Sequence, residues 1–140
     1  MSQGNVELIR SLYEAFGRGD VPAVLASFAP DIRWQEAEGF VYADGNPYVG
    51  PDAILQGVFG RLATEWDGFT VTPDSYLDAG EAVVVQGHYT GAFKATGRPI
   101  RAQLAHVWTV RDGKIVAFQQ YTDTFQFARA VEGRQESAGA

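Results

Sequence analysis

The sequence has 140 residues, 46% of them apolar and 13% aromatic, so we expect one compact domain with a sizeable core. Eleven basic residues against seventeen acidic ones give a formal net charge of −6, and the basic residues are scattered, which argues against nucleic acid as a partner. Because the chain has no cysteine, no membrane-length apolar run and no signal sequence, we expect a cytoplasmic protein without disulfides, thiolate metal sites or cofactors.

Two helices are predicted at the start of the chain. Apolar residues recur at three- and four-residue steps from Val6 to Phe16, and the segment "GRGD" ends this amphipathic helix. Asp20 is then expected to cap a short second helix, with Pro22 in its first turn and its end near Phe28.

A strand over Ile32–Glu36 and a third helix beginning at Pro51-Asp52 follow. From Gly68 onward the sequence alternates with period two. The predicted strands are 69–78, 82–93, 100–110 and 114–124, joined by turns at 79–80, 95–99 and 112–113. Helices followed by a strand meander indicate an α+β protein, with a curved antiparallel sheet wrapped around three N-terminal helices and a pocket between the layers. The polar tail, residues 129–140, is expected to fray.

One register of the hairpin 82–93 with 100–110 places apolar residues around His106. In this register, position 83 pairs with 110, 85 with 108 and 87 with 106, so that Gly87 leaves open space opposite the imidazole. A one-residue shift would place His88 beside His106 as a possible metal pair, but it would also bury Gln86 and Thr90. We therefore reject the shifted register and the metal site.

The turn "RDGK" at 111–114 decides which residues of the last strand face His106. A two-residue loop aligns His106 with positions 119, 121 and 123. A three-residue loop with a bulge at Gly113 pairs Val110 with Lys114 and brings positions 118, 120 and 122 to that face. The hydrophobic pattern fits both loops, because both faces of this strand carry apolar residues.

Four segments in this order, "LYEAFGRGDVPAVLASFAPDIRW", "YVGPDAI", "TGRPI" and "HVWTVRDGKIVAFQQY", resemble the SnoaL-like branch of the nuclear transport factor 2-like superfamily. The resemblance covers Val6 to Thr124, and we expect residues 1–128 to form a single such domain. It implies a cone-shaped α+β barrel with an internal pocket. This fold hosts isomerases, cyclases, hydrolases, dehydratases and binding modules, so the function has to be argued from the site.

The resemblance favours the three-residue turn, with Gln120 inward and Asp123 outward. SnoaL-type cyclases carry their acid–base aspartate at the position matching Gln120 and a histidine at the position matching His106, and limonene epoxide hydrolases also place a catalytic aspartate there. An amide cannot accept a proton at neutral pH, so the cyclase mechanism does not transfer directly. The Asp–Arg–Asp relay of epoxide hydrolysis cannot be assembled around Gln120 either.

Glu36 is the candidate base. It stands eight residues after Phe28, the offset at which ketosteroid isomerases, which the resemblance includes, carry their general-base aspartate. By the same comparison, His106 matches the oxyanion-stabilising aspartic acid of the isomerases, and their oxyanion tyrosine matches Leu12 rather than Tyr13.

Glu36 and His106 are therefore the expected catalytic residues, facing each other across one cavity. Trp34 beside Glu36, and Leu104 and Trp108 beside His106, should exclude water, which raises the pKa of the carboxyl and lowers that of the imidazole. An ion pair between the two would reverse both shifts. The alternative interpretation of His106 is a core histidine whose hydrogen bonds are satisfied.

The pocket wall is expected to be aromatic, with one amide that orients a ligand. The predicted ligand-binding residues are Trp34, Gln120, Trp108, Phe118, Tyr89, Phe59, Leu104 and Tyr13. Tyr42 and Tyr48 precede the third helix, where a mobile lid could form.

These residues favour an enzyme that transfers a proton on a small, largely apolar carbonyl compound, as in an isomerisation or a cyclisation, without metal or cofactor. The alternative is a non-catalytic module that binds a small apolar ligand in the same cavity. We also expect a homodimer formed through the outer face of the sheet. The apolar residues predicted on that face are Ala105, Val107, Ile115, Ala117 and Tyr121.

Overall fold

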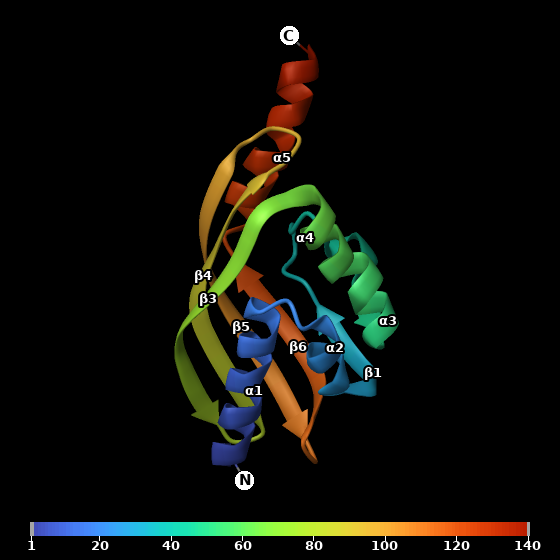
Figure 1. The fold of residues 1–140 in the computed structure, drawn as a ribbon, viewed down its shortest axis with the longest axis vertical. Helices are drawn as coiled ribbons and strands as arrows, with labels where there is room; N and C mark the ends of the chain where they lie inside the picture. The colour runs from blue at the N-terminus through green and yellow to red at the C-terminus, as the bar shows by residue number, and fades with distance from the viewer. Residues whose placement is uncertain (1, 140) are drawn as a thin grey trace.

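A computed structural model describes the backbone of residues 2–139 and the side chains of residues 4–132. Six strands form one curved sheet in the order β2-β1-β6-β5-β4-β3 (Figure 1). The strands are β1 (Phe28–Gln35), β2 (Tyr48–Val49), β3 (Trp66–Ala79), β4 (Ala82–Phe93), β5 (Pro99–Arg111) and β6 (Lys114–Thr122). β1 and β6 are parallel and the other neighbours antiparallel, so the sheet is mixed.

The helices lie on the inner side of the sheet and at one of its ends. They are α1 (Ser2–Gly17), α2 (Val21–Ala26), the 3₁₀ turn η1 (Ala43–Gly45), α3 (Pro51–Ile54), the π-helical segment η2 (Leu55–Phe59), α4 (Gly60–Glu65) and α5 (Thr124–Gly139). The predicted α+β class and the sheet curved around helices are confirmed, although the sheet is open rather than a closed barrel. Within residues 2–139, no helix is long and apolar enough to cross a membrane.

The helix predictions hold because each rests on a local signal. In α1, Ile9, Leu12 and Tyr13 are buried, as the apolar spacing requires. The carboxylate of Asp20 accepts a hydrogen bond from the backbone N–H of Ala23 at 3.2 Å and so caps α2. The third predicted helix is the continuous segment α3-η2-α4.

The predicted register of β4 with β5 is wrong by two residues. Val85, not Gly87, pairs with His106, and Gly87 pairs with Leu104. The backbone N–H of Gly97 bonds the carbonyl oxygen of Phe93 at 2.7 Å, so the chain reverses earlier than expected. Because the error is an even number of residues, the same side chains still face inward.

Gly87 does not leave space opposite the imidazole. A side chain there would collide with the carbonyl oxygen of Thr72 on β3, where the pairing of β3 with β4 shifts register between Pro73 and Ser75. Glycine is required at this position because two backbones approach closely.

The predicted three-residue turn after β5 is also wrong. Arg111 pairs with Lys114 around Asp112 and Gly113, whose φ angles of 53° and 76° are those of a two-residue hairpin turn. The extra residue lies further along β6, because Val110 pairs with Ile115 while Thr109 pairs with Ala117.

Because of this bulge at Val116, positions 118, 120 and 122 lie on the same face of the sheet as His106, as predicted. His106 pairs with Gln120, which points inward, and Asp123 does not line the cavity. The bulge also turns Ile115 into the core, where it is fully buried, so its predicted place on the outer face is wrong. Tyr121 is exposed on that face, and the dimer stays a prediction.

The C-terminal segment was predicted as a strand to residue 124 and a frayed tail from residue 129. Instead, β6 ends at Thr122 and α5 follows. Phe127 is fully buried and Ala130 is buried too, so the first turns of α5 belong to the packed domain. The side chains beyond Glu132 lie outside the described residues, and the prediction for them stays untested.

Gly87→Ala is expected to lower the free energy of unfolding by about 1–3 kcal/mol, because the new methyl group forces β3 and β4 apart. Urea unfolding measures this loss. Gly17→Ala is the control, because a methyl group there meets nothing within 4 Å. Equal stability of the two variants would contradict the close approach of β3 to Gly87.

Candidate active site

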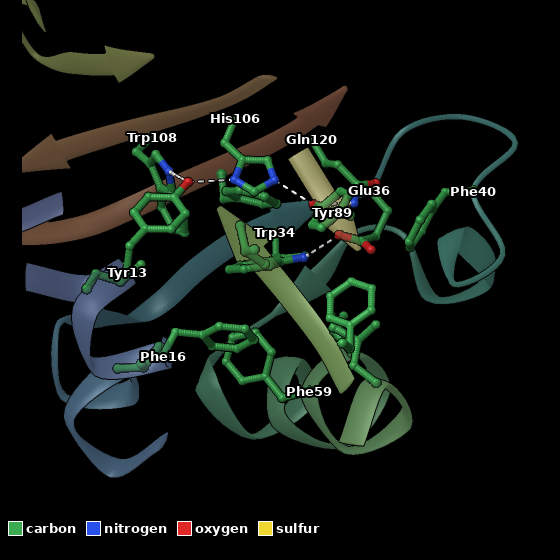
Figure 2. Close-up of a pocket in the computed structure, with 17 residues that line it drawn as sticks. Tyr13, Phe16, Trp34, Glu36, Phe40, Phe59, Tyr89, His106, Trp108 and Gln120 are labelled. Carbon is green, nitrogen blue, oxygen red and sulfur yellow. Dashed lines mark hydrogen bonds between the residues drawn. The ribbon is translucent and has the colours of Figure 1, made fainter. Parts of the chain in front are cut away.

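A cavity of about 50 Å³ lies between α1, η2 and the inner face of the sheet (Figure 2). Its wall is almost entirely aromatic and aliphatic, and its polar groups come from three buried residues, Glu36, His106 and Gln120, and from tyrosine hydroxyls. The predicted residues that line it are Tyr13, Trp34, Glu36, Phe59, Tyr89, His106, Trp108, Phe118 and Gln120.

Glu36 follows the last residue of β1, and its position is fixed on three sides. The side chain of Asn46 bonds both its backbone N–H and its carbonyl oxygen at 2.9 Å. The indole N–H of Trp34 donates to Oε1 of Glu36 at 2.6 Å. Among the described residues, Oε2 has no hydrogen-bond partner. One carboxylate oxygen is thus held and the other is available for chemistry.

His106 lies between two tyrosine hydroxyls. The hydroxyl of Tyr13 is 2.6 Å from Nδ1, and that of Tyr89 is 2.5 Å from Nε2. Trp108 donates its indole N–H to the hydroxyl oxygen of Tyr13 at 2.8 Å. Both ring nitrogens are therefore occupied by protein groups, so the imidazole does not itself reach a ligand.

Gln120 holds the other end of this chain of hydrogen bonds. Its Nε2 donates to the hydroxyl oxygen of Tyr89 at 2.9 Å, and its Oε1 accepts from the backbone N–H of Ala37 at 3.1 Å. These two bonds fix the amide in one orientation. The position that carries an acid–base aspartate in SnoaL-type cyclases here orients a tyrosine.

Burial changes the acidity of both predicted catalytic groups. Desolvation raises the pKa of Glu36 to about 7, although the bond from Trp34 and the charge of Arg61 act in the opposite direction. Desolvation lowers the pKa of His106 to about 3. Both predicted directions are confirmed. Near neutral pH the imidazole is uncharged, and the carboxyl can both release and take up a proton.

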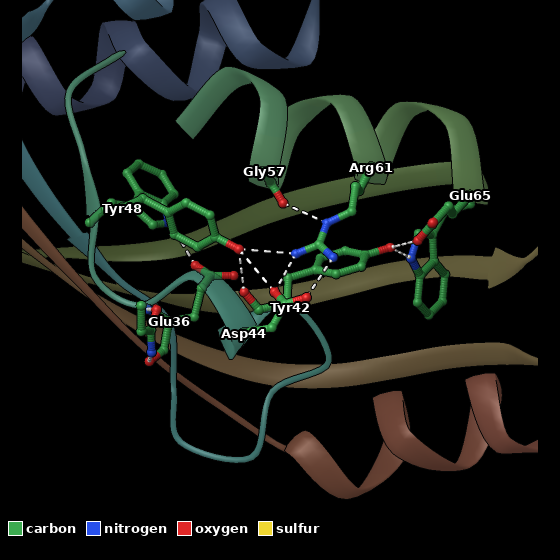
Figure 3. A network of polar contacts seen from close by, with 10 residues as sticks. Glu36, Tyr42, Asp44, Tyr48, Gly57, Arg61 and Glu65 are labelled. Atoms are coloured by element: carbon green, nitrogen blue, oxygen red, sulfur yellow. Dashed lines mark hydrogen bonds and ion pairs between the residues drawn. The ribbon is translucent and has the colours of Figure 1, made fainter. Parts of the chain in front are cut away.

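A second polar network lies near Glu36 (Figure 3). The guanidinium of Arg61 donates to both carboxylate oxygens of Asp44, at 2.7 and 3.0 Å, and to the hydroxyl of Tyr48 at 3.0 Å. It also lies over the ring of Tyr42, 4.2 Å from the ring centre.

Tyr42 and Tyr48 are both buried, so the side chains of these two residues pack inside the protein and do not lie on an exposed lid. The hydroxyl of Tyr48 donates to the carbonyl oxygen of Tyr42 at 2.7 Å. A side chain on Gly57 of η2 would collide with the ring of Tyr48, so the two segments pack directly on each other.

One other sequence prediction, for Leu104, is wrong, whereas the rejected pairing of His88 with His106 is also absent from the structure. Leu104 is buried in a second core cluster that contains Phe127, and it does not line the cavity. His88 pairs with Gln103 and its Nδ1 lies 3.0 Å from a carboxylate oxygen of Asp74, which keeps it apart from His106. No group of three or more metal-ligating side chains occurs among residues whose side chains are described.

Eight apolar residues of the wall and the Tyr13–His106 contact were not predicted from the sequence. The missed wall residues are Leu12, Phe16, Val24, Phe40, Val58, Leu62, Phe69 and Val71. The helical spacing of Leu12 with Phe16 and of Val58 with Leu62 could have indicated inward faces. Nothing in the spacing shows that Tyr13 reaches a strand ninety-three residues away.

Glu36→Gln is expected to raise the free energy of unfolding at pH 8 and to change it much less at pH 5. A carboxyl whose pKa rises from 4.5 to about 7 on folding stabilises the fold fully below pH 4.5, and this contribution is lost as the pH rises through 7. At about 1.4 kcal/mol per pKa unit, the difference at pH 8 is a few kcal/mol.

Urea unfolding at both pH values checks this, with Glu38→Gln as the control because Glu38 is exposed. A Glu36→Gln effect that is the same at pH 5 and pH 8 would show that the carboxyl of Glu36 is not buried in the folded protein.

Comparison with known proteins places the chain in a family. Residues 9–118 match the SnoaL-like domain family. An NTF2-like protein from Burkholderia thailandensis E264 is 41% identical over 90% of this chain and 95% of its own, with a TM-score of 0.86. TerC, crystallized with polyporic acid, is 27% identical over 92% of this chain and 98% of its own, with a TM-score of 0.81.

IdmH from Streptomyces antibioticus, for which a polyketide cyclase role has been proposed, shares the fold. It is 23% identical over 89% of this chain and 96% of its own, with a TM-score of 0.74. Proteins with curated functions gave no match. The family match and the shared fold agree with the resemblance seen in the sequence: the chain belongs to the SnoaL-like domain family of the nuclear transport factor 2-like superfamily.

Proposed function

We propose that the cavity binds a small, largely apolar carbonyl compound and that Glu36 transfers a proton at the carbon next to the carbonyl, in an isomerisation or a cyclisation. One observation carries the proposal. The carboxyl of Glu36 is buried, has one oxygen without a partner among the described residues, and has a pKa of about 7. A general base works best when its pKa is near the working pH.

The proposed step balances within the cavity. Oε2 of Glu36 takes the proton from the carbon, the electrons of the C–H bond form a C=C bond, and the carbonyl electrons move to the oxygen. A tyrosine hydroxyl of the Tyr13–His106–Tyr89 cluster donates a hydrogen bond to that oxygen as its negative charge grows. Return of the proton from Glu36 to another carbon gives an isomer. In a cyclisation, the enolate carbon instead attacks a second carbonyl carbon, the π electrons of that carbonyl move to its oxygen, and this oxygen takes the proton back from Glu36.

The neutral state of His106 supports this chemistry. An imidazolium beside the two tyrosines would need a compensating charge in an apolar cavity, whereas a neutral ring keeps both phenols polarised without adding charge. Burial also raises the pKa of Tyr13 and of Tyr89, so both remain hydroxyl donors near neutral pH.

The walls and the size of the cavity limit the substrate. A volume of about 50 Å³ is a few times the 10–15 Å³ or so that one water requires, which favours a compact molecule. The tryptophan and phenylalanine wall favours an apolar body with one polar end directed at Glu36 and the tyrosines. The co-crystallization of TerC with polyporic acid supports an organic ligand for this chain too.

A binding module without catalysis is the second candidate, and Gln120 is the observation that favours it. SnoaL-type cyclases use an aspartate there, and the amide of Gln120 cannot take a proton. In this alternative, Glu36 only accepts a hydrogen bond from a ligand.

Glu36→Gln is expected to slow the exchange of α-hydrogens of small cyclic ketones in D₂O by about 10²–10⁴-fold, the usual contribution of a general base. Proton NMR of the ketone follows the exchange. Glu36→Asp should retain part of the rate, because the carboxylate is kept but withdrawn by one methylene. Binding should change little in Glu36→Gln, since the shape of the side chain is kept.

Glu38→Gln is the matched control, because it removes an exposed carboxylate two residues along the chain. If Glu36→Gln and Glu38→Gln exchange the ketone at the wild-type rate, Glu36 is not the base. If the wild-type protein binds ketones without exchanging them, the binding module is the correct function.

A further inference from the structure

Five groups form a continuous chain of hydrogen bonds along one side of the cavity, in the order Trp108–Tyr13–His106–Tyr89–Gln120 (Figure 2). The two ends of this chain can only donate. The indole N–H of Trp108 and the amide N–H of Gln120 each point at a phenol oxygen. Both phenol oxygens therefore already accept one hydrogen bond.

The two hydrogen bonds that join His106 to Tyr13 and to Tyr89 cannot use all the protons that these three residues carry. The neutral imidazole of His106 carries one N–H, and the two phenols carry one O–H each, which makes three protons for two bonds. One phenol donates to the ring, and the other accepts from it. The hydroxyl proton of the accepting phenol is then left over and has to point into the cavity.

The position of Glu36 decides which phenol that is. Figure 2 shows Glu36 on the Tyr89 side of the imidazole and Tyr13 on the other side. Burial is the main cause of the raised pKa of Tyr89, and the negative charge of Glu36 adds to it. Among the described residues, Tyr13 has no such carboxylate influence: the other groups that raise its pKa are the phenols of Tyr89 and Tyr76, which are uncharged near neutral pH. An O–H dipole is stabilised when its hydrogen faces a carboxylate.

We propose that Tyr89 presents the spare hydroxyl proton to the cavity, and that His106 is a positioning residue that keeps its own proton on Nε2 while Glu36 is charged. In this arrangement Tyr13 donates to Nδ1, and Nε2–H donates to Tyr89. The assignment of the tautomer stands on the hydrogen bonds and on the position of Glu36, and does not depend on the proposed function. The further step, in which Tyr89 donates to the carbonyl oxygen of a substrate, rests on the proposed function.

The groups that face this chain come from every element packed around it. α1 contributes Tyr13, β3 contributes Tyr76, whose ring makes an edge-to-face contact with that of Tyr13, and β4 contributes Tyr89. Glu36 follows β1, and Arg61 of α4 acts on its charge. Because the phenols are neutral near pH 7, protonation of Glu36 is the change that removes the bias toward Nε2–H.

The tautomer can be measured without a ligand. The chain has two histidines, so ¹⁵N-histidine labelling gives two ring systems, and His88→Gln assigns that of His106. At pH 8.5 we expect Nδ1 of His106 to have the shift of an unprotonated nitrogen and Nε2 that of an N–H. As the pH falls through the titration of Glu36 to 5.5, the population of the Nδ1–H tautomer should increase while the ring stays neutral.

Glu36→Gln is the matched variant, because it removes the charge and keeps the size. The tautomer shift between pH 8.5 and pH 5.5 should be absent in it. The proposal is overturned by an Nδ1–H tautomer in the wild-type protein at pH 8.5. It is also overturned if the tautomer shift persists in Glu36→Gln or does not occur in the wild-type protein.

Two conservative variants test the donor itself. Tyr89→Phe should slow ketone exchange by about 10²–10³-fold, the usual effect of removing one donor to a developing oxyanion. Tyr13→Phe should slow it by about tenfold or less, because it only removes a partner of His106. A larger loss of exchange rate in Tyr13→Phe than in Tyr89→Phe would show that Tyr13 is the donor and would contradict the proposal. If the wild-type protein shows the predicted tautomer but no exchange, the proposed function fails and the assignment of His106 stands.

Discussion

The burial of a carboxyl and an imidazole in one apolar cavity is the constraint on which the other features of this protein depend. A buried polar atom without a partner costs about 1–3 kcal/mol, so each such group needs a fixed neighbour. Trp34 and Asn46 hold Glu36, while Tyr13 and Tyr89 hold His106. Those partners come from β1, α1, β4 and the loop before β2, so the cavity ties together elements that are far apart in sequence.

The two groups are not equally satisfied. His106 uses both ring nitrogens within the protein, whereas Glu36 leaves Oε2 without a partner among the described residues. Its raised pKa means that the charged form destabilises the fold above neutral pH. A group retained at such a cost is characteristic of a functional site rather than of a structural core. This asymmetry is why we assign proton transfer to Glu36 and a positioning role to His106.

Local patterns in the sequence predict most of the fold, because periodicity and capping depend on neighbouring residues. The face of His106 was also predicted correctly, although the predicted turn was not. The two-residue turn at Asp112-Gly113 and the bulge at Val116 together bring the same face of β6 inward as the predicted three-residue turn, although His106 pairs with Gln120 and not with Phe118. Pattern alone could not separate these cases, because period two is unchanged when a bulge moves along a strand.

The sequence could not predict contacts that depend on how distant elements pack against each other. The close approach of β3 to Gly87 accompanies the register shift between Pro73 and Ser75, and Tyr13 of α1 reaches His106 on β5. Leu104 packs in the second cluster with Phe127 and does not line the cavity. The residue types within one helix or strand do not determine such contacts.

The measurement that most directly tests the central claim is the titration of the Glu36 side-chain carboxyl carbon by ¹³C NMR in glutamate-labelled protein, with the signal assigned by its loss in Glu36→Gln. The account predicts a midpoint near pH 7. A midpoint near the ordinary value of 4.5 would show a hydrated carboxylate and would contradict the assignment of Glu36 as a buried base.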